Sequence, residues 1–260
     1  MEPIVKIQVH QHTATVTLNR PDKRNALSRG LLSELHQALD DLHLERKVRG
    51  VVVTGAGPSF CAGMDLSEML TTAETDDPQA QWHSDSVVYH GLIEKMLRFP
   101  KPLVAAVNGP AVAGGAGIVM ACDLVVAGQR AMFGFPEPRR GIVAGMVAPL
   151  LAFRIGGSRA AQLLLTARVI DAHEAHDFGL FQQVVDDDKV WARAYQLVGE
   201  VAMSAPDALQ MTKRLLNETI GEQLLSQLVT GAAVSAASRT TEAAAEGLAA
   251  FREKREPEWW

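Results

Sequence analysis

Glu137 lies in an apolar, proline-flanked segment, Met132-Phe-Gly-Phe-Pro-Glu-Pro-Arg-Arg-Gly141. Aromatic and proline neighbours disfavour the charged form of a carboxyl group and raise its pKa toward the range that is useful for proton transfer. We therefore interpret Glu137 as a candidate general acid and base. The alternative from this segment alone is a structural ion pair with Arg139 or Arg140.

Backbone amides form the second candidate group. The stretch from Pro102 to Asp123 reads as a buried strand, a turn, and an apolar helix that begins at the glycine pair Gly114-Gly115. The first N–H groups of a helix lack intrahelical partners and carry partial positive charge, so an oxyanion beside Gly114 would be stabilised. A second glycine loop, Phe60-Cys-Ala-Gly-Met-Asp65, follows another predicted strand.

Strands and helices alternate through the first part of the chain. The spacing predicts strands at 4–9, 13–18, 50–54, 103–107 and 124–127, and helices at 28–45, 82–99 and 114–121. Such alternation predicts parallel strands with crossover helices, an α/β arrangement in which ligands bind beyond the carboxyl ends of the strands. Both glycine loops are expected at that edge. The acidic stretch from Glu74 to Pro78 reads as a mobile connection.

Helical patterns dominate from Gly157 onward, where strands become scarce. The predicted helices are 160–166, 171–178, 190–204, 206–219, 222–238 and 242–255. The last third of the chain is therefore expected to form a helical layer.

Composition limits the classes of protein. The chain has 260 residues, of which 47% are hydrophobic and 21% charged, as expected for a globular protein of one large or two modest domains. A net charge of −5 argues against nucleic acid as a partner. The two cysteines, Cys61 and Cys122, read as buried thiols, which favours a cytoplasmic location.

The sequence also predicts no targeting segment, no membrane-spanning segment and no metal-binding cluster. The N-terminal residues show neither a secretory signal nor a transit segment. The apolar run 102–122 is long enough to span a bilayer, but the turn sequence Asn108-Gly109-Pro110 interrupts it. No cluster of His, Cys and Asp has the spacing of metal ligands.

Four segments in order resemble the crotonase family, also called the enoyl-CoA hydratase/isomerase superfamily. They are 17–27 (TLNRPDKRNAL), 59–66 (SFCAGMDL), 105–115 (AAVNGPAVAGG) and 251–257 (FREKREP). The resemblance covers essentially the whole chain. It implies a ββα spiral core with the acyl-CoA site over residues 1–200, and a C-terminal helical region over 201–260 that packs subunits into trimers, commonly paired into hexamers.

The resemblance also implies roles for individual residues. The amides of Met64 and Gly114 would bind the thioester oxygen of an acyl-CoA as it becomes an enolate, a role in which each donor contributes about 3 kcal/mol. Coenzyme A would enter as part of the substrate, with no prosthetic group. Its implied contacts are the backbone around Ala62, Asp65 and Leu66, the basic residues Lys23 and Arg24 near the phosphates, Ala26 in the channel, and Phe251 and Lys254 reaching the cofactor of the neighbouring subunit. The alternative for each basic residue is a solvated surface charge.

The chain departs from the family pattern at one position. Typical hydratases of the family carry two glutamates; the second matches Glu137, but the first falls on Gly117. A general acid or base contributes about a hundred- to ten-thousandfold in rate, so two-carboxylate hydration is handicapped. Two reactions remain, isomerisation of a 3-enoyl thioester and hydration of a 2-enoyl thioester by Glu137 alone. A non-catalytic acyl-CoA-binding protein on the same scaffold is a third alternative.

Other residues carry weaker expectations. The helix 82–99 should roof the acyl pocket, where His90 could be a second proton carrier, although a core or surface role is the alternative for both His83 and His90. Family dehalogenases need an aspartate where this chain has Gly145. Five bulky apolar side chains are predicted to pack in the pocket or in the core, and their bulk suggests an apolar acyl group: Met64, Met69, Trp82, Val143 and Met146. The terminal pair Trp259-Trp260 could be a pocket lid, an interface anchor or a tail.

Overall fold

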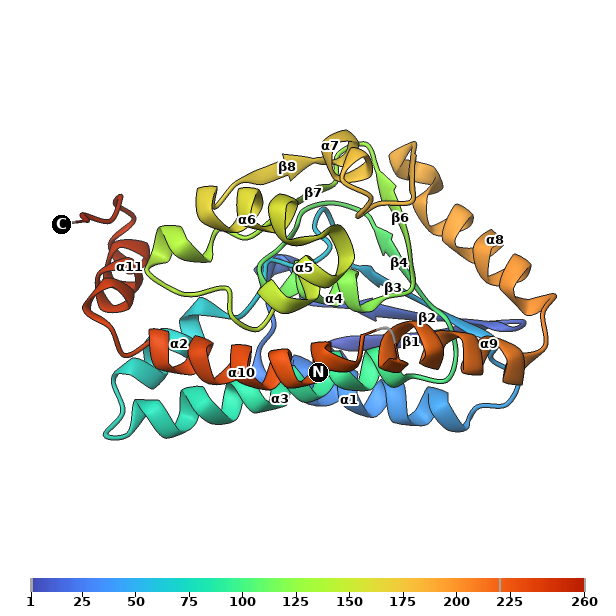
Figure 1. The fold of residues 1–260 in the computed structure, drawn as a ribbon, viewed down its shortest axis with the longest axis horizontal. Coiled ribbons are helices and arrows are strands. Elements are labelled where there is room, and N and C mark those ends of the chain that lie inside the picture. Colours follow the sequence, from blue (N-terminus) through green and yellow to red (C-terminus); the bar gives the residue numbers. More distant parts are fainter. Residues whose placement is uncertain (1, 220, 260) are drawn as a thin grey trace.

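A twisted six-stranded sheet forms the centre of the molecule (Figure 1). The computed structural model describes residues 2–219 and 221–259. Along the sheet the strand order is β1 (Val5–His10), β2 (Thr13–Leu18), β3 (Gly50–Gly55), β4 (Leu103–Val107), β6 (Leu124–Gly128) and β9 (Gln183–Val185). The β1–β2 pair is an antiparallel hairpin, and every later neighbour in this sheet is parallel. The predicted α/β arrangement is confirmed.

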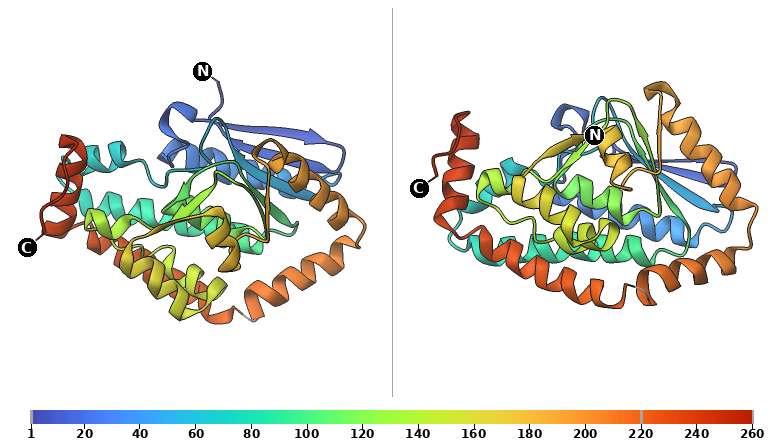
Figure 2. Two further views of the ribbon diagram at one scale, coloured as in Figure 1. Left: turned by 90° about the horizontal axis from the view of Figure 1, so that it is seen from above. Right: turned by 45° about the horizontal axis from the view of Figure 1, so that its top comes forward.

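The two faces of the sheet pack against different helices. Val51 and Val53 of β3 belong to the large core with α1 (Arg29–Leu44), α3 (Pro78–Arg98) and α4 (Gly114–Ala121). Val52 points to the other face, where it packs with residues of α8 (Val190–Ala202). Burial on both faces explains why β3 and β4 are continuous apolar runs instead of alternating ones. Figure 2 shows α8 lying apart from the helices of the opposite face.

A second sheet, not predicted from the sequence, supports the site. It contains β5 (Ala111–Val112), β7 (Met132–Gly134) and β8 (Val169–Asp171). Strands β5 and β7 pair in parallel, and the N–H of Ala113 donates to the carbonyl of Gly134 over 2.9 Å. This pairing brings the segment before Glu137 beside the segment before Gly114.

Most predicted helices are confirmed, with differences at their ends. α3 begins at Pro78 instead of Trp82, because Asp77 caps it by accepting a hydrogen bond from the N–H of Ala80. The predicted helix 206–219 is divided into α9 (Pro206–Arg214) and one π-helical turn, Leu215–Thr219. Two helices were not predicted, α2 (Leu66–Ala73) and α5 (Ala148–Ile155). The remaining helices are α6 (Gly157–Thr166), α7 (Ala172–Asp177), α10 (Glu222–Ser238) and α11 (Glu242–Glu253).

The C-terminal helices fold back over their own chain. α10 lies along α3, and α11 packs against the 3₁₀ turn Glu137–Arg140 (Figures 1 and 2). The approach is backbone to backbone: a Cβ on Gly145 would overlap the carbonyl of Gly231 in α10, and a Cβ on Gly247 would overlap the carbonyl of Arg140. The predicted C-terminal helical layer is therefore present, and it closes over the loop that follows Glu137.

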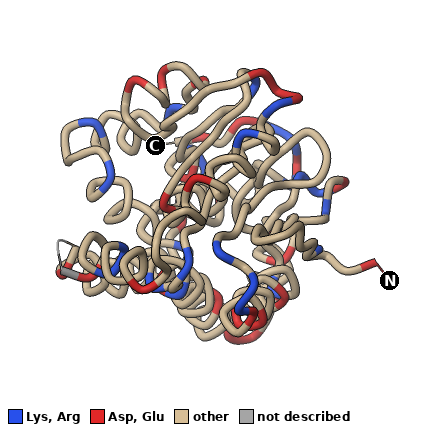
Figure 3. The backbone as a smooth tube through the Cα atoms, turned by 90° about the vertical axis from the view of Figure 1, so that its right-hand side faces the viewer, with Lys and Arg blue, Asp and Glu red and all other residues tan. Residues whose placement is uncertain are grey.

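Charges are interspersed along the chain (Figure 3). Both cysteines are free and buried, as predicted, and burial raises the pKa of each thiol to about 12. Within the described residues, no helix combines the length and apolar character needed to cross a membrane.

Candidate active site

A cavity of about 90 Å³ lies where the two glycine loops, the Glu137 turn and α10 meet. It collects Met64 and Gly114 from the glycine loops, Glu137 from the turn, and Ser235 and Arg239 from α10. The other lining residues are Ala62, Leu66, Met69, Ala113, Pro136, Arg140, Ile142, Val143, Ala144, Met146 and Val147. The three predicted catalytic positions thus share one small and mostly apolar space.

The two glycine loops touch through their backbones. Gly63 has a φ of 86°, and a Cβ there would lie 2.7 Å from the Cβ of Ala113 and 3.2 Å from the nitrogen of Gly114. Only glycine permits both this conformation and this contact. The loop before Met64 is therefore held directly against the beginning of α4.

The N–H groups of Met64 and Gly114 are left unused by the backbone. Leu27 forms a parallel bridge with Met64, but it bonds the flanking residues: its N–H donates to Gly63 and its carbonyl accepts from Asp65. Gly114 is the first residue of α4, and in the described part of the chain neither N–H donates to a backbone acceptor. The preceding residue, Ala113, has a φ of 53° and a ψ of −127°, which is strained for a residue with a Cβ. These two donors are available to a ligand.

Glu137 begins the 3₁₀ turn after β7. The residue as a whole is half-buried, but its Oε2 is fully buried and has no hydrogen-bond partner among the described residues. Burial raises the pKa of this carboxyl to about 7. Among the described residues no ion pair joins Glu137 to Arg139 or Arg140. The guanidinium of Arg140 instead stacks over the ring of Phe251, 4.9 Å from its centroid.

Tyr89 of α3 is a site residue that the sequence did not indicate. It is fully buried, and its hydroxyl donates a 2.7 Å hydrogen bond to the carbonyl of Gly114. Burial raises the pKa of Tyr89 well above its ordinary value, and negative charge on Cys61 or Glu137 would raise it further, so the hydroxyl remains a donor. Its bond fixes the first turn of α4.

The space at Gly117 is already filled. A Cβ on Gly117 would overlap the hydroxyl of Tyr89 and would lie 2.7 Å from Cγ1 of Val147. The structure therefore holds no room for the first glutamate of the family pattern at this position, and Glu137 is the only carboxylate among the described residues that line the cavity.

Three polar cavity residues were also missed, Arg140, Ser235 and Arg239. Arg239 is 3% exposed, and its Nε and Nη1 are buried without a partner in the described part of the chain. Ser235 and Arg239 lie one helical turn apart and so share a face of α10. Their spacing was visible in the sequence, but nothing in it showed that this face turns toward Glu137.

The predicted coenzyme A contacts are divided between the cavity and the surface. Ala62 and Leu66 line the cavity, and the N–H of Ala62 donates to the carbonyl of Arg24 over 3.0 Å. The side chains of Lys23 and Arg24 are exposed, and Ala26 is half-buried beside them.

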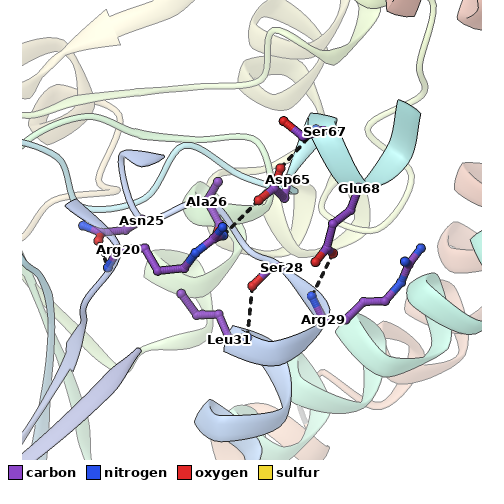
Figure 4. A network of polar contacts seen from close by, with 9 residues as sticks. All are labelled: Arg20, Asn25, Ala26, Ser28, Arg29, Leu31, Asp65, Ser67 and Glu68. Atoms are coloured by element: carbon purple, nitrogen blue, oxygen red, sulfur yellow. Dashed lines mark hydrogen bonds and ion pairs between the residues drawn. The ribbon is translucent and has the colours of Figure 1, made fainter. Parts of the chain in front are cut away.

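Asp65 has a structural role that the sequence did not reveal. It caps α2 by accepting from the N–H of Ser67 over 3.0 Å, and it forms a 2.9 Å ion pair with Arg20, which also donates to the carbonyl of Ala26 (Figure 4). The pair ties the segment 20–26 to the end of the first glycine loop.

Phe251 and Lys254 lie on α11, outside the cavity lining. Phe251 is 38% exposed and reaches the site only through Arg140, and Lys254 is an exposed residue at the end of the helix with a φ of 55°. Their predicted contact with a neighbouring subunit's cofactor remains a prediction.

The expected pocket residues are confirmed in part. Met64, Met69, Val143 and Met146 line the cavity, and Trp82 takes the core alternative, buried outside the lining. His83 is exposed and His90 is half-buried, and neither belongs to the lining. Trp259 is 48% exposed, and Trp260 lies outside the described residues. Across residues 2–219 and 221–259, no group of three or more His, Cys, Asp or Glu could hold a metal ion.

Two glycine loops beside a largely parallel sheet line one cavity together with a buried carboxyl group, an arrangement suited to an enzyme site. Comparison with known proteins identifies the family. The chain matches the family described as enoyl-CoA hydratase/isomerase over residues 8–260, and it belongs to that family. It is 36% identical to an enoyl-CoA hydratase of Mycobacterium tuberculosis, covering 98% of this chain and 96% of that protein. It is 34% identical to the 2,3-dehydroadipyl-CoA hydratase of Escherichia coli, covering 96% and 95%.

Solved structures agree with this assignment. The crystal structure of an enoyl-CoA hydratase/isomerase from Xanthobacter autotrophicus matches with a TM-score of 0.89 at 27% identity, covering 96% of this chain and 93% of that one. The fold is therefore the crotonase fold expected from the four sequence segments.

Proposed function

We propose that this protein hydrates a 2-enoyl-CoA thioester, using Glu137 as its single acid and base and the amides of Met64 and Gly114 as an oxyanion hole. One observation carries the proposal: a buried, unpartnered carboxyl group whose pKa is about 7 shares a small cavity with two unused backbone donors. A group with that pKa can both take and give a proton near neutral pH. Relatives named as hydratases support the same reaction.

The reaction can be written with one carboxylate. Ionised Glu137 accepts a proton from water as the water oxygen bonds to C3 of the enoyl group, and the electron pair moves to the thioester oxygen. The two amides stabilise the enolate that results. Glu137 then returns its proton to C2 as the carbonyl re-forms. Atoms balance, since one water is added and the carboxyl group is regenerated.

Isomerisation is the second candidate, and the filled space at Gly117 favours it. With one carboxylate and no second acid at the cavity, Glu137 can remove a proton from C2 of a 3-enoyl thioester and deliver it to C4. The same two amides would hold the dienolate between these steps. This reaction needs no water, which suits the apolar lining.

Coenzyme A is part of the substrate in both proposals, and no prosthetic group takes part. We place its thioester between the two glycine loops. The part of coenzyme A that leads out of the cavity would then contact Ala62, Asp65, Leu66 and Ala26. Its phosphates would lie near Lys23 and Arg24. We further propose a homotrimer, or a hexamer of two trimers, in which Phe251 and Lys254 approach the cofactor of the adjacent subunit.

The test compares wild type with Glu137→Gln on 2-butenoyl-CoA and 3-hexenoyl-CoA, with products identified by mass. We expect a loss of at least a hundredfold in kcat/KM, the lower end for a missing acid or base. Glu200→Gln, on the far helix α8, is the matched control and should keep full activity. A gain of one water mass identifies hydration, and a new 2-enoyl product of unchanged mass identifies isomerisation.

Binding of butyryl-CoA, which cannot react, separates catalysis from simple binding. We expect Glu137→Gln to bind it within a few-fold of wild type. Equal turnover by Glu137→Gln and wild type would overturn the catalytic assignment. Tight binding by a wild-type protein that converts neither substrate would instead support the non-catalytic alternative.

A further inference from the structure

A buried arginine side chain, Arg239, lines the otherwise mostly apolar cavity. Arg239 terminates α10 and lines the cavity, yet it is 3% exposed. Two of its three guanidinium nitrogens, Nε and Nη1, are buried and donate to no partner in the part of the chain that the structure describes. A buried charged group without hydrogen bonds is costly, so such a group points to a missing partner.

The carboxylate of Asp85 does not fill that role. Asp85 of α3 acts on the charge of Arg239, but its two oxygens already accept from Nε and Nη2 of Arg29, at 2.7 and 2.8 Å, and from the amide of Gln81. Arg29, Asp85 and Arg239 together therefore carry one net positive charge. Burial lowers the pKa of Arg239 from its ordinary value, as expected for a cation whose charge is incompletely balanced.

Neither of the other two ionisable residues that line the cavity balances Arg239, since Arg140 carries the same charge and Glu137 is not paired with Arg239 in the described part of the chain. Glu137 has a pKa of about 7 set by burial, and no ion pair joins it to Arg239 among the described residues. Ser235, one turn before Arg239 on the same face of α10, adds a hydroxyl to this end of the cavity. The site thus offers a guanidinium and a hydroxyl, both inside the cavity, to an anion that enters with the acyl group.

We infer that the acyl chain of the substrate ends in a carboxylate that Arg239 binds, so that the substrate is the coenzyme A monothioester of a short unsaturated dicarboxylic acid. Arginine pairs with carboxylates through parallel N–H groups, and because Arg239 is 3% exposed and lines the cavity, its partner must be a group that enters the cavity. This inference rests on the proposed acyl-CoA function.

The size of the cavity limits the length of that chain. A cavity of roughly 150 Å³ holds a benzene molecule, and this one measures about 90 Å³. Only a few carbon atoms fit between the oxyanion donors at Met64 and Gly114 and the guanidinium of Arg239. A five-carbon diacid such as glutaric acid is a suitable probe.

The experiment measures binding of three unreactive thioesters: glutaryl-CoA, its terminal amide, and butyryl-CoA. We expect wild type to bind glutaryl-CoA roughly ten- to a hundredfold more tightly than the amide, because one charge-assisted interaction is lost. Arg239→Met should abolish this preference. Arg214→Met, which removes an exposed arginine at the end of α9, is the matched control and should retain it.

The acid-to-amide comparison in wild type needs no variant, so it remains decisive if Arg239→Met fails to fold. Equal binding of the acid and the amide, or a preference for the amide or butyryl-CoA, would overturn the inference. Failure of the proposed function would appear separately, as absence of turnover with 2-butenoyl-CoA and glutaconyl-CoA in a protein that still prefers glutaryl-CoA over its amide.

Discussion

The hydroxyl of Tyr89 lies where the side chain of a residue at Gly117 would begin. The same hydroxyl bonds the carbonyl of Gly114, three residues earlier in α4. One aromatic side chain thus does two things: it fills the space that the family's first glutamate would need, and it anchors the helix turn that presents the Gly114 amide. The glycine and the tyrosine are a coupled pair, and single substitutions at either should reveal it.

Gly117→Glu should destabilise the protein without adding hydratase activity. The new side chain would overlap the Tyr89 hydroxyl and Val147, and overpacking of a core together with burial of a carboxyl group costs about 3 kcal/mol. Urea unfolding measures the change. Gly157→Glu is the matched control, because a Cβ at Gly157 meets nothing within 4 Å and the residue begins α6. Equal stability of the two variants would contradict the packing argument.

Tyr89→Phe should lower kcat while leaving KM nearly unchanged. The ring would still pack, but the buried carbonyl of Gly114 would lose its hydrogen bond, at a cost of about 1–3 kcal/mol in the free energy of unfolding. Movement of the first turn of α4 would misplace the oxyanion donor, which acts mainly in the transition state. Steady-state kinetics with 2-butenoyl-CoA measures the effects on kcat and KM separately.

Tyr195→Phe serves as the control for this prediction. It removes an exposed 3.1 Å hydrogen bond to Gln11, far from the cavity, and should change neither parameter. A rise in KM with unchanged kcat in Tyr89→Phe would show that the tyrosine serves substrate binding instead.

The sequence predicted the central fold well where burial leaves a local pattern. The apolar runs around Val52 and Val104 indicated buried strands, and the alternation of such strands with helices predicted the parallel sheet. The strands of the second sheet have only two or three residues, too few to show a period. Their positions depend on pairing with distant segments, which no local pattern records.

The same division holds for the site. Gly114 and Glu137 were identifiable because a glycine pair and an apolar setting mark them locally, and Met64 was identified through the family resemblance; all three line the cavity. Tyr89 and Arg239 become site residues only because α3 and α10 pack together beside the cavity. The sequence therefore indicated three residues that line the cavity, but the side chains from other elements that shape it required the folded chain.

Asp65→Ala should cost more stability than the loss of an ordinary helix cap. The substitution removes the cap of α2 and also leaves Arg20 without its carboxylate, and together these should reduce the free energy of unfolding by about 3 kcal/mol. Asp77→Ala, which removes only the exposed cap of α3, should cost about 1 kcal/mol. Similar losses in the two variants would show that the Arg20 ion pair contributes little.

The raised pKa of Glu137 should be visible in the pH dependence of the free energy of unfolding. Its pKa is about 7 in the folded protein against an ordinary value of 4.5, so the folded state holds this proton more tightly than the unfolded state. The stability that Glu137 contributes is therefore lost as the pH rises from about 4.5 through about 7, by about 3 kcal/mol in total. Glu137→Gln should lack this loss, so the stability of the variant relative to wild type should increase as the pH rises.

Urea unfolding of both proteins at pH 5 and pH 8 measures the difference. Activity should run the opposite way: kcat/KM of wild type rises with pH and levels off above an apparent pKa of about 7, because the ionised carboxylate must accept the first proton. A stability difference between wild type and Glu137→Gln that stays constant from pH 5 to pH 8 would show that the carboxyl group titrates normally. The acid and base role would then lose the support that it draws from burial, since a glutamate with an ordinary pKa is a weaker base toward the attacking water.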